Sequence, residues 1–287
     1  MRIGIVLGCG LGNVLFQVAT AAAIADRMGA EGILVASYRP EHQTVSHGHF
    51  LRGLEWPEDP DAVVDAAVLY ADDMGRDAYD VFARRAEEVG ALLRAGRVSG
   101  TQAHDPGGPL LILVGMFQNP RYFWDRRDAI RERFGPTPED RARILAGPYG
   151  DALRHGAVFV HVRRGDYVGS GFDIGLVEHG YYGRALAALR AGAQPPAPAL
   201  APVLVCSDDI AWCRGQAALA GLGPRVEWVD GLDEVDTLFL MTMCTHGGVC
   251  ANSTYSWWGA FLGPGRGCWP AAYRYEQYAF PGLIPVE

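Results

Sequence analysis

A short apolar run that ends in a cluster of charged side chains constrains the fold of this chain most. Ala157–Val160 predicts a buried strand, and His161-Val-Arg-Arg-Gly-Asp-Tyr167 follows it at once. Ligands bind at the carboxyl ends of strands in open α/β sheets, and a guanidinium offers a planar fork of N–H donors to a phosphate. The segment therefore predicts either an anion site or a structural ion pair that joins Arg163, Arg164 and Asp166.

Strands and helices alternate along the chain, in two halves that meet near Gly150. Apolar runs predict seven strands, at Ile3–Leu7, Ile33–Ala36, Leu110–Val114, Ala157–Val160, Val203–Cys206, Arg225–Val229 and Gly248–Cys250. Helical patterns lie between them, at residues 13–28, 61–95, up to Phe134, and at 181–190, 210–220, 234–244 and 255–262. His42–Trp56 and Gln194–Pro198 predict loops. The alternation indicates an α/β fold with parallel sheets.

Polar side chains follow each strand of the second half. They are Ser207-Asp-Asp209, Asp230 to Asp236, and Asn252-Ser-Thr-Tyr-Ser256, besides the arginine segment. Turns after parallel strands share one edge of a sheet, so these groups are expected to converge. Ser253, Thr254 and Ser256 can cap a helix N-terminus that faces an anion. Asp236 can accept two N–H bonds from a guanine edge, or it can simply be a charge in a first helical turn.

Simpler structural roles are open for other members of this set. Asp208 and Asp209 are typical helix caps. Trp257 and Trp258 are more typical of a packed core than of a stacking platform. In the first half, Gly8-x-Gly-x-Gly12 follows a strand and precedes a helix that Asn13 could cap, but its spacing and the lack of a following acidic residue disfavour NAD binding.

Composition excludes some classes of function. The formal net charge is −8, which disfavours nonspecific nucleic-acid binding. The six cysteines form no C-x-x-C pair and lie mostly in apolar runs, so we expect them to be reduced and buried, as in a cytoplasmic protein. No charged leader and no apolar stretch of the roughly 20 residues that a membrane span needs is recognisable.

Five segments, taken together, resemble one known family. Gly10-Leu-Gly-Asn-Val-Leu-Phe-Gln17 and Gly115-Met-Phe-Gln-Asn-Pro-Arg-Tyr-Phe123 are similar to its N-terminal motifs. His161-Val-Arg-Arg-Gly-Asp-Tyr167 matches its H-x-R-R-G-D-Y motif, Ser207-Asp-Asp-Ile-Ala-Trp212 is similar to S-D-D-I-x-W, and residues 236–260 resemble its closing block. This family is glycosyltransferase family 11, the α-1,2-fucosyltransferases. The motifs keep the family's order and span nearly the whole chain.

The resemblance implies a GT-B fold, with two Rossmann-like α/β domains that face a cleft. Residues 1–150 would form the acceptor-binding domain and residues 151–287 the domain that binds GDP-fucose. Carried over by motif, Arg163 would contact the donor pyrophosphate, with His161 and Asp166 as further catalytic residues. Donor-binding residues would be Gly12, Asn13, His161, Arg163, Arg164, Asp236, Ser253, Thr254 and Ser256.

The implied reaction transfers L-fucose from GDP-β-L-fucose to a galactose-terminated glycan with inversion. Arginines and a helix N-terminus can stabilise the departing GDP, so no metal and no cofactor besides the donor is expected. A general base stays open: Asp173, Glu178 and His179 are candidates, as is late proton loss to water. Fucose transfer with α-1,3 or α-1,6 linkage, and a non-catalytic protein that binds a sugar nucleotide, are the alternatives. We expect a cytoplasmic enzyme, with peripheral membrane contact through a lipid acceptor left open.

Overall fold

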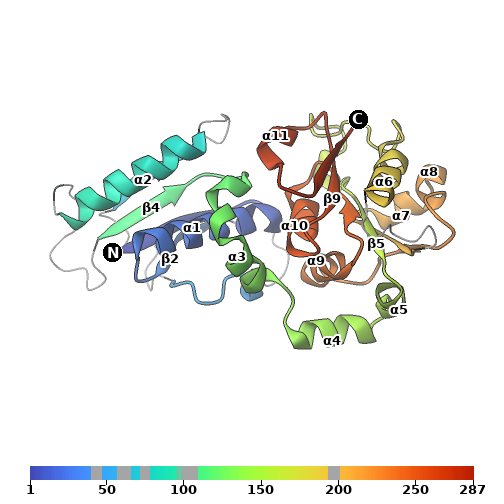
Figure 1. Cartoon of the computed structure of the whole chain (residues 1–287), viewed down its shortest axis with the longest axis horizontal. Helices are drawn as coiled ribbons and strands as arrows, with labels where there is room; N and C mark the ends of the chain where they lie inside the picture. Colours follow the sequence, from blue (N-terminus) through green and yellow to red (C-terminus); the bar gives the residue numbers. More distant parts are fainter. Residues whose placement is uncertain (40–46, 57–65, 72–77, 96, 98–108, 193–200) are drawn as a thin grey trace. The chain divides into compact units, whose positions relative to one another are not determined.

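The structure, a computed structural model, forms two compact units, Met1–Arg133 and Phe134–Glu287. It describes residues 1–39, 47–56, 66–71, 78–95, 97, 109–192 and 201–287 (Figure 1). The predicted linker Gln194–Pro198 and the start of the predicted loop at His42 lie outside the described residues. The units divide before helix α4 (Pro138–Ala146), whereas the boundary expected from the sequence lies at residue 150.

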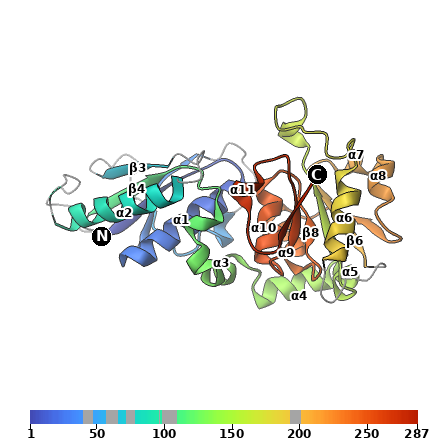
Figure 2. The ribbon, with the colours of Figure 1, turned by 45° about the horizontal axis from the view of Figure 1, so that its top comes forward.

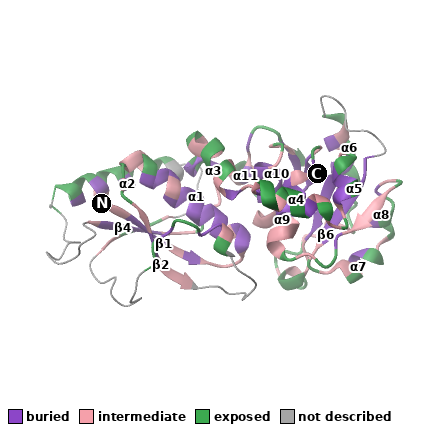
Figure 3. Cartoon of the chain, turned by 90° about the horizontal axis from the view of Figure 1, so that it is seen from below, coloured by how far each residue is buried: buried purple, intermediate pink, exposed green. Residues whose placement is uncertain are grey.

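The first unit contains a four-stranded parallel sheet of order β2-β1-β4-β3. Its strands are β1 (Arg2–Gly8), β2 (Ile33–Arg39), β3 (Ala67–Tyr70) and β4 (Leu110–Val114). Its helices are α1 (Leu11–Met28) and α2 (Ala78–Arg94), and the chain leaves the unit through 3-10 turns at Pro120–Tyr122 and Trp124–Arg126 and through α3 (Arg127–Phe134). Helix α1 is the most deeply buried helix of this unit (Figure 3). The residues of β3 were expected to be helical, and this expectation is wrong.

Helix α1 ends at Met28, as the sequence predicts, and begins at Leu11, two residues before the predicted start at residue 13. Gly29 follows Met28 in the left-handed conformation, with φ of 59°, which glycine adopts at little cost. At the other end Gly10 is the N-cap residue, so the prediction that Asn13 caps this helix is wrong. The side chain of Asn13 instead accepts a hydrogen bond of 2.6 Å from Nε2 of Gln118.

The second unit contains a six-stranded parallel sheet of order β10-β9-β8-β5-β6-β7. Its strands are β5 (Val158–Val162), β6 (Val203–Ser207), β7 (Val226–Trp228), β8 (Gly248–Val249), β9 (Gly267–Pro270) and β10 (Leu283–Val286). Its helices after α4 are α5 (Gly150–Arg154), α6 (Tyr181–Ala191), α7 (Ile210–Arg214), α8 (Ala217–Ala220), α9 (Glu234–Met243), α10 (Thr254–Leu262) and α11 (Tyr275–Tyr278). Helix α6 packs on the sheet, while α9 and α10 pack against each other (Figure 2). The prediction of an α/β fold with parallel sheets is confirmed.

The core of the second unit is apolar and aromatic. Strand β5 is buried along its whole length, as expected for a central strand covered on both faces. Trp257 and Trp258 are completely buried, so the prediction that they pack in a core is confirmed. All six cysteines are free thiols, and all but Cys9 are buried, which confirms the predicted burial for five of the six.

Gln17 joins two segments of the first unit that are far apart in the sequence. Its Oε1 accepts from the backbone N–H of Gly8 at 3.0 Å, and its Nε2 donates to the carbonyl of Gly115 at 3.2 Å. Gly8 ends β1, and Gly115 follows β4, its neighbour in the sheet. The side chain therefore fixes the first glycine turn against the segment after β4.

Replacing Gln17 by leucine is expected to lower the free energy of unfolding by about 1–2 kcal/mol, because two half-buried backbone groups lose their partners. Urea denaturation followed by circular dichroism measures this loss. The matched control is Gln216→Leu, since the amide of Gln216 makes one long hydrogen bond of 3.4 Å to Trp212. Equal stability of Gln17→Leu and the wild type would contradict the structural role of Gln17.

Candidate functional site

The arginine segment lies where the order of strands in the second sheet reverses. From β5 the chain builds outward through β6 and β7, and then returns to the other side of β5 with β8. Arg163 follows β5, and Asn252 follows shortly after β8. The carboxyl ends of two such strands flank the crevice in which open parallel sheets bind ligands. The predicted convergence is therefore found for the segments after β5, β6 and β8.

Two carboxylates hold the guanidinium of Arg163. Its Nη2 lies 2.5 Å from Oδ1 of Asp166, and its Nη1 lies 2.8 Å from Oδ2 of Asp208. The guanidinium also lies over the ring of Tyr167, with its central carbon 5.5 Å from the ring centroid. The predicted pairing of Arg163 with Asp166 is thus present, whereas Arg164 pairs with Asp209 instead, and Asp166 and Asp208 fix a cation at the end of the central strand.

Arg164 is held by a separate set of groups. Its Nε lies 3.2 Å from Oδ2 of Asp209, and its guanidinium stacks on the indole of Trp212 with a separation of 3.6 Å from the ring centroid. Its backbone N–H donates to Oδ1 of Asp208 at 2.9 Å. The two arginines therefore point to different partners, and Asp208 contacts both residues.

Gly165 makes the close approach of Asp208 possible. A Cβ at this position would lie 2.5 Å from Oδ2 of Asp208, closer than real Cβ contacts allow. Asp209 accepts from the backbone N–H of Trp212 at 3.1 Å and caps α7, as predicted. Asp208 does not cap α7, so the same prediction is wrong for Asp208. Its role in holding the arginines has no signal in the local sequence, because it depends on the pairing of β5 with β6.

His161 lies below this turn, inside the sheet. Its side chain is only 4% exposed and its ring packs on the ring of Tyr255 at 5.4 Å. Nδ1 is buried and has no hydrogen-bond partner. Burial, together with the nearby charge of Arg163, lowers the pKa of His161 to about 3. The imidazole is therefore neutral at physiological pH.

The buried histidine predicts a loss of stability in acid. Between pH 6.5 and about 3, the unfolded chain binds a proton at His161 that the folded chain does not bind. The free energy of unfolding should therefore fall with decreasing pH by up to about 1.4 kcal/mol per pH unit from this residue, and show no such contribution above pH 6.5. His161→Leu should remove that slope, whereas the same change at exposed His179 should not. Parallel pH profiles of wild type and His161→Leu would contradict this expectation.

Helix α10 begins beside the arginine turn. Ser253 is its N-cap residue, with an extended backbone and no capping hydrogen bond from its side chain. The hydroxyl of Ser256 donates to the carbonyl of Ser253 at 3.1 Å. Tyr167 connects the two segments, since its hydroxyl donates to the carbonyl of Asn252 at 3.1 Å. The N-terminal end of α10 thus lies close to the Arg163 turn, which suits a negatively charged ligand.

Asp236 lies farther along the sheet edge, in the first turn of α9. Asp233 caps this helix by accepting from the backbone N–H of Asp236 at 2.8 Å. The carboxylate of Asp236 pairs with Arg143 of α4, which also contacts Asp140 at 2.9 Å. These pairs raise the pKa of Arg143 above its ordinary value. Asp236 is therefore not part of the ion-pair cluster around Arg163.

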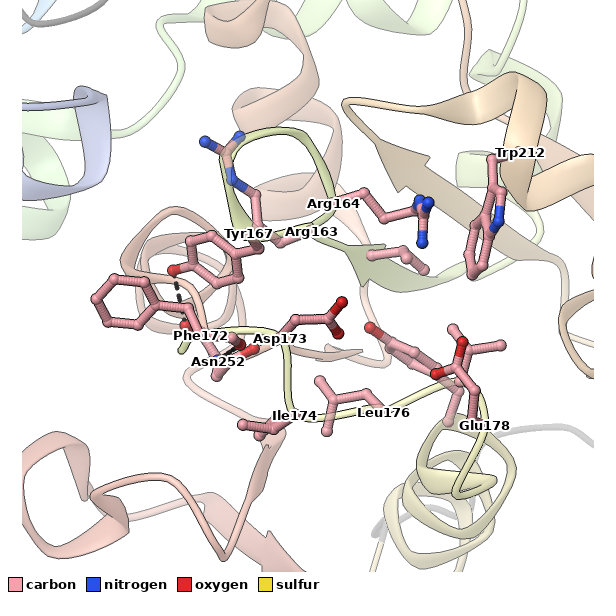
Figure 4. Close-up of a pocket in the computed structure, with 13 residues that line it drawn as sticks. Arg163, Arg164, Tyr167, Phe172, Asp173, Ile174, Leu176, Glu178, Trp212 and Asn252 are labelled. Atoms are coloured by element: carbon pink, nitrogen blue, oxygen red, sulfur yellow. Dashed lines mark hydrogen bonds between the residues drawn. The ribbon is translucent and has the colours of Figure 1, made fainter. Parts of the chain in front are cut away.

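A pocket opens between the arginine turn and the loop that follows it (Figure 4). Its polar lining comes from Arg163, Arg164, Asp173, Glu178 and Asn252, and its apolar lining comes chiefly from aromatic and aliphatic side chains. The apolar members are Val162, Tyr167, Phe172, Ile174, Leu176, Val177, Tyr182 and Trp212. Of the three residues predicted as candidates for the general base of catalysis, Asp173 and Glu178 line this pocket and His179 does not. Asn252 belongs to the polar segments that were expected to converge here, whereas nothing in the sequence indicated Phe172 as a lining residue.

The remaining predicted residues, Gly12 and Asn13, belong to the first unit. They lie in the first turn of α1, next to the reversal of strand order between β1 and β4. The contacts of Asn13 with Gln118 and of Gln17 with Gly115 bring the two N-terminal motifs together.

No group of three or more His, Cys, Asp or Glu side chains in the described part of the chain is arranged to hold a metal ion. Within the same residues, none of the helices combines the length and the apolar character needed to cross a membrane.

Comparison with known proteins finds similarity in sequence and in fold. The profile described as Glycosyl transferase family 11 matches residues 110–280, which is more than half of the chain. An α-1,2-colitosyltransferase of Escherichia coli is 30% identical over 154 residues, covering 52% of this chain and 50% of that protein. Galactoside α-(1,2)-fucosyltransferase 2 of Oryctolagus cuniculus is 35% identical over 140 residues, covering 45% and 36%. The matches thus span half or less of these two relatives.

Among solved structures, the fucosyltransferase NodZ from Bradyrhizobium superposes with a TM-score of 0.50 at 18% identity. The superposition covers 92% of this chain and 93% of NodZ. Together with the two parallel sheets, this likeness confirms the predicted GT-B class of fold.

Proposed function

The chain belongs to glycosyl transferase family 11, and from this premise we propose that it transfers L-fucose from GDP-β-L-fucose to a galactose-terminated glycan, with α-1,2 linkage and inversion. The observation that carries the proposal is the arginine turn at the reversal of strand order, beside the N-terminal end of α10. Fixed cations and helix N–H groups at such a crevice suit a diphosphate.

The proposed catalysis rests on stabilising the leaving group. Breaking the bond between fucose and GDP places negative charge on the β-phosphate, and the guanidinium of Arg163 can bind that charge. Asp166 and Asp208 hold Arg163 in place, so little reorganisation is needed as the charge develops. Arg164, Ser253, Thr254 and Ser256 are the further proposed phosphate contacts. With these groups present, the proposed reaction needs no metal ion.

His161 and the two residues of the first unit have supporting roles in this proposal. His161 is neutral and buried, so it would position the arginine turn from below rather than transfer a proton. Gly12 and Asn13 stay proposed donor contacts. The assignment of donor binding to the second unit and acceptor binding to the first likewise stays a proposal.

Asp236 is the proposed reader of the guanine base. A carboxylate can accept from both N1–H and the exocyclic amine of guanine, in the planar manner in which it accepts from a guanidinium. In the structure this carboxylate pairs with Arg143 of α4.

Asp173 is the proposed general base. Inversion requires a group that removes the proton of the acceptor hydroxyl as it attacks the anomeric carbon. Asp166 is already held by Arg163, whereas Asp173 lines the pocket and points toward its middle (Figure 4). Glu178 lines the same pocket at its other side and is the second candidate.

The test is release of GDP from GDP-fucose by the purified chain, in the presence of EDTA, with and without β-galactosides such as lactose and N-acetyllactosamine. We expect release that is stimulated by an acceptor and unchanged by EDTA, with an α-1,2 bond in the isolated product. A product with α-1,3 or α-1,6 linkage would overturn the linkage. Tight binding of GDP-fucose without turnover would favour a non-catalytic binding protein.

A nucleotide-activated colitose is the second donor to include, because the E. coli relative at 30% identity is named a colitosyltransferase. A preference for colitose over fucose would overturn the proposed donor sugar but keep the proposed site.

A further inference from the structure

The loop that follows the arginine turn exposes an aromatic ring beside the pocket. Phe172 is 48% exposed, although it is a large apolar residue. It follows Gly169-Ser170-Gly171 and contributes to the lining of the pocket between the arginines and Glu178. In Figure 4 its ring lies beside that of Tyr167, at the opposite side of the pocket from Trp212. An exposed ring at this place requires an explanation other than core packing.

The backbone and the ring of Phe172 are held in position. Its carbonyl accepts from Nδ2 of buried Asn252 at 2.9 Å, and its N–H donates to the hydroxyl of Ser170 at 3.1 Å. Its ring packs on the ring of Tyr167, with centroids 5.3 Å apart and planes inclined by 31°. The exposed ring is therefore ordered before a ligand arrives, which reduces the entropic cost of binding.

The composition of this side of the pocket suits a pyranose. Sugars present a face of C–H groups that packs on aromatic rings and a rim of hydroxyl groups that bind carboxylates and amides. Phe172 supplies the ring, and the neighbouring Asp173 supplies a carboxylate in the same pocket. Galactose has a larger continuous C–H face than most hexoses, so it is well matched to such a pair.

The position of Phe172 relative to Arg163 indicates which sugar it contacts. The guanidinium of Arg163 lies 5.5 Å from the Tyr167 ring, which lies 5.3 Å from the ring of Phe172. Tyr167 therefore stands between Arg163 and Phe172 (Figure 4). If Arg163 binds the donor phosphate, a sugar beyond the fucose would lie on the Phe172 side of the pocket.

We propose that Phe172 is a stacking platform for the acceptor galactose, so that the second unit carries part of the acceptor site. The inference rests on the proposed function, since it takes the Arg163 turn as the donor site. It assigns acceptor recognition to a residue outside the family motifs and outside residues 1–150. Asn252, which fixes the loop, acts on acceptor binding only through the backbone of Phe172.

The test compares the full chain with Phe172→Ala, Phe172→Tyr and the matched control Val168→Ala, which removes another exposed apolar side chain (53% exposed) of the same loop. Initial rates of GDP release give the KM for lactose and for GDP-fucose. Binding of GDP-fucose is measured by calorimetry, and binding of methyl β-galactoside in the presence of GDP is measured by saturation-transfer NMR. Melting temperatures check that each variant is folded.

We expect Phe172→Ala to raise the acceptor KM about tenfold and to weaken the NMR signal of the galactoside, with GDP-fucose affinity within a factor of about two of the wild type. Phe172→Tyr should restore the acceptor KM, and Val168→Ala should change neither constant. An unchanged acceptor KM in Phe172→Ala overturns the inference, and so does weakened binding of GDP-fucose, which would place the donor sugar on the ring.

Failure of the proposed function has a different signature. A wild-type chain that binds neither GDP nor GDP-fucose overturns the donor site and the inference together. A wild-type chain that binds GDP-fucose but neither binds nor fucosylates a β-galactoside leaves the donor site standing and overturns the platform for galactose.

Discussion

Replacing Arg163 by alanine is expected to lower the rate of fucose transfer by about two to three orders of magnitude, because the cation that meets the departing diphosphate is lost. The effect should be in kcat as well as in kcat/KM, since the charge on the leaving group is largest in the transition state. Initial rates of GDP release at saturating acceptor measure it. The fold should persist, because the Arg163 side chain is at the turn and not in the core.

Two further variants distinguish the role of Arg163 from a general effect of charge. Arg163→Lys keeps the charge but loses the planar fork that contacts Asp166 and Asp208 at once, so it should recover little activity. Arg214→Ala is the matched control, because Arg214 is an exposed arginine of the same unit that pairs with Asp230 at 3.3 Å. Near-normal activity of Arg163→Ala, or equal losses in the two alanine variants, would contradict the donor site.

The largest effect on stability is expected for Trp257→Ala. The indole of Trp257 is completely buried, stacks on Phe261 at 4.9 Å and meets Trp258 and Phe280 edge to face. Its Nε1 donates to the carbonyl of Tyr278 at 2.8 Å. Truncation would leave a large cavity and an unpaired carbonyl, and should lower the free energy of unfolding by about 3–5 kcal/mol. Urea denaturation followed by circular dichroism measures this loss.

Trp257→Phe separates packing from hydrogen bonding. Phenylalanine retains much of the stack on Phe261 but has no donor for Tyr278, so we expect a smaller loss of about 1–2 kcal/mol. If Trp257→Ala cost less than Trp257→Phe, the packing account of this core would be wrong.

Most strands could be predicted because they are buried on both faces and apolar throughout. Leu110–Val114 is found as predicted, and five of the other six predicted strands end within two residues of the observed ends. Strands β3, β9 and β10 were not predicted, each for a physical reason. In β3, Val68 and Tyr70 are exposed at a sheet edge, and its apolar residues resemble a helix face. Strands β9 and β10 each contain a proline, which argues against a strand in sequence alone.

The site was predicted in outline but not in its contacts. Parallel topology alone brings the segments after β5, β6 and β8 to one edge, so their convergence follows from the sequence pattern. The bridging of Arg163 and Arg164 by Asp208 does not, because it needs the register of β5 against β6 and the missing Cβ of Gly165. Asn13 shows the reverse case, in which a typical cap residue is used for a contact with Gln118 instead.

The positions of the cysteine thiols allow local unfolding of each unit to be followed by alkylation. Five of the six cysteines are buried in the second unit, and burial raises the pKa of Cys206, Cys244, Cys250 and Cys268. Only a thiolate reacts readily with an alkylating reagent, so these residues are labelled when their surroundings open. Cys9, half-buried at the first glycine turn, reports on the other unit. Measuring the number of alkylated cysteines per molecule over time would therefore follow the local unfolding of the two units separately, without any introduced probe.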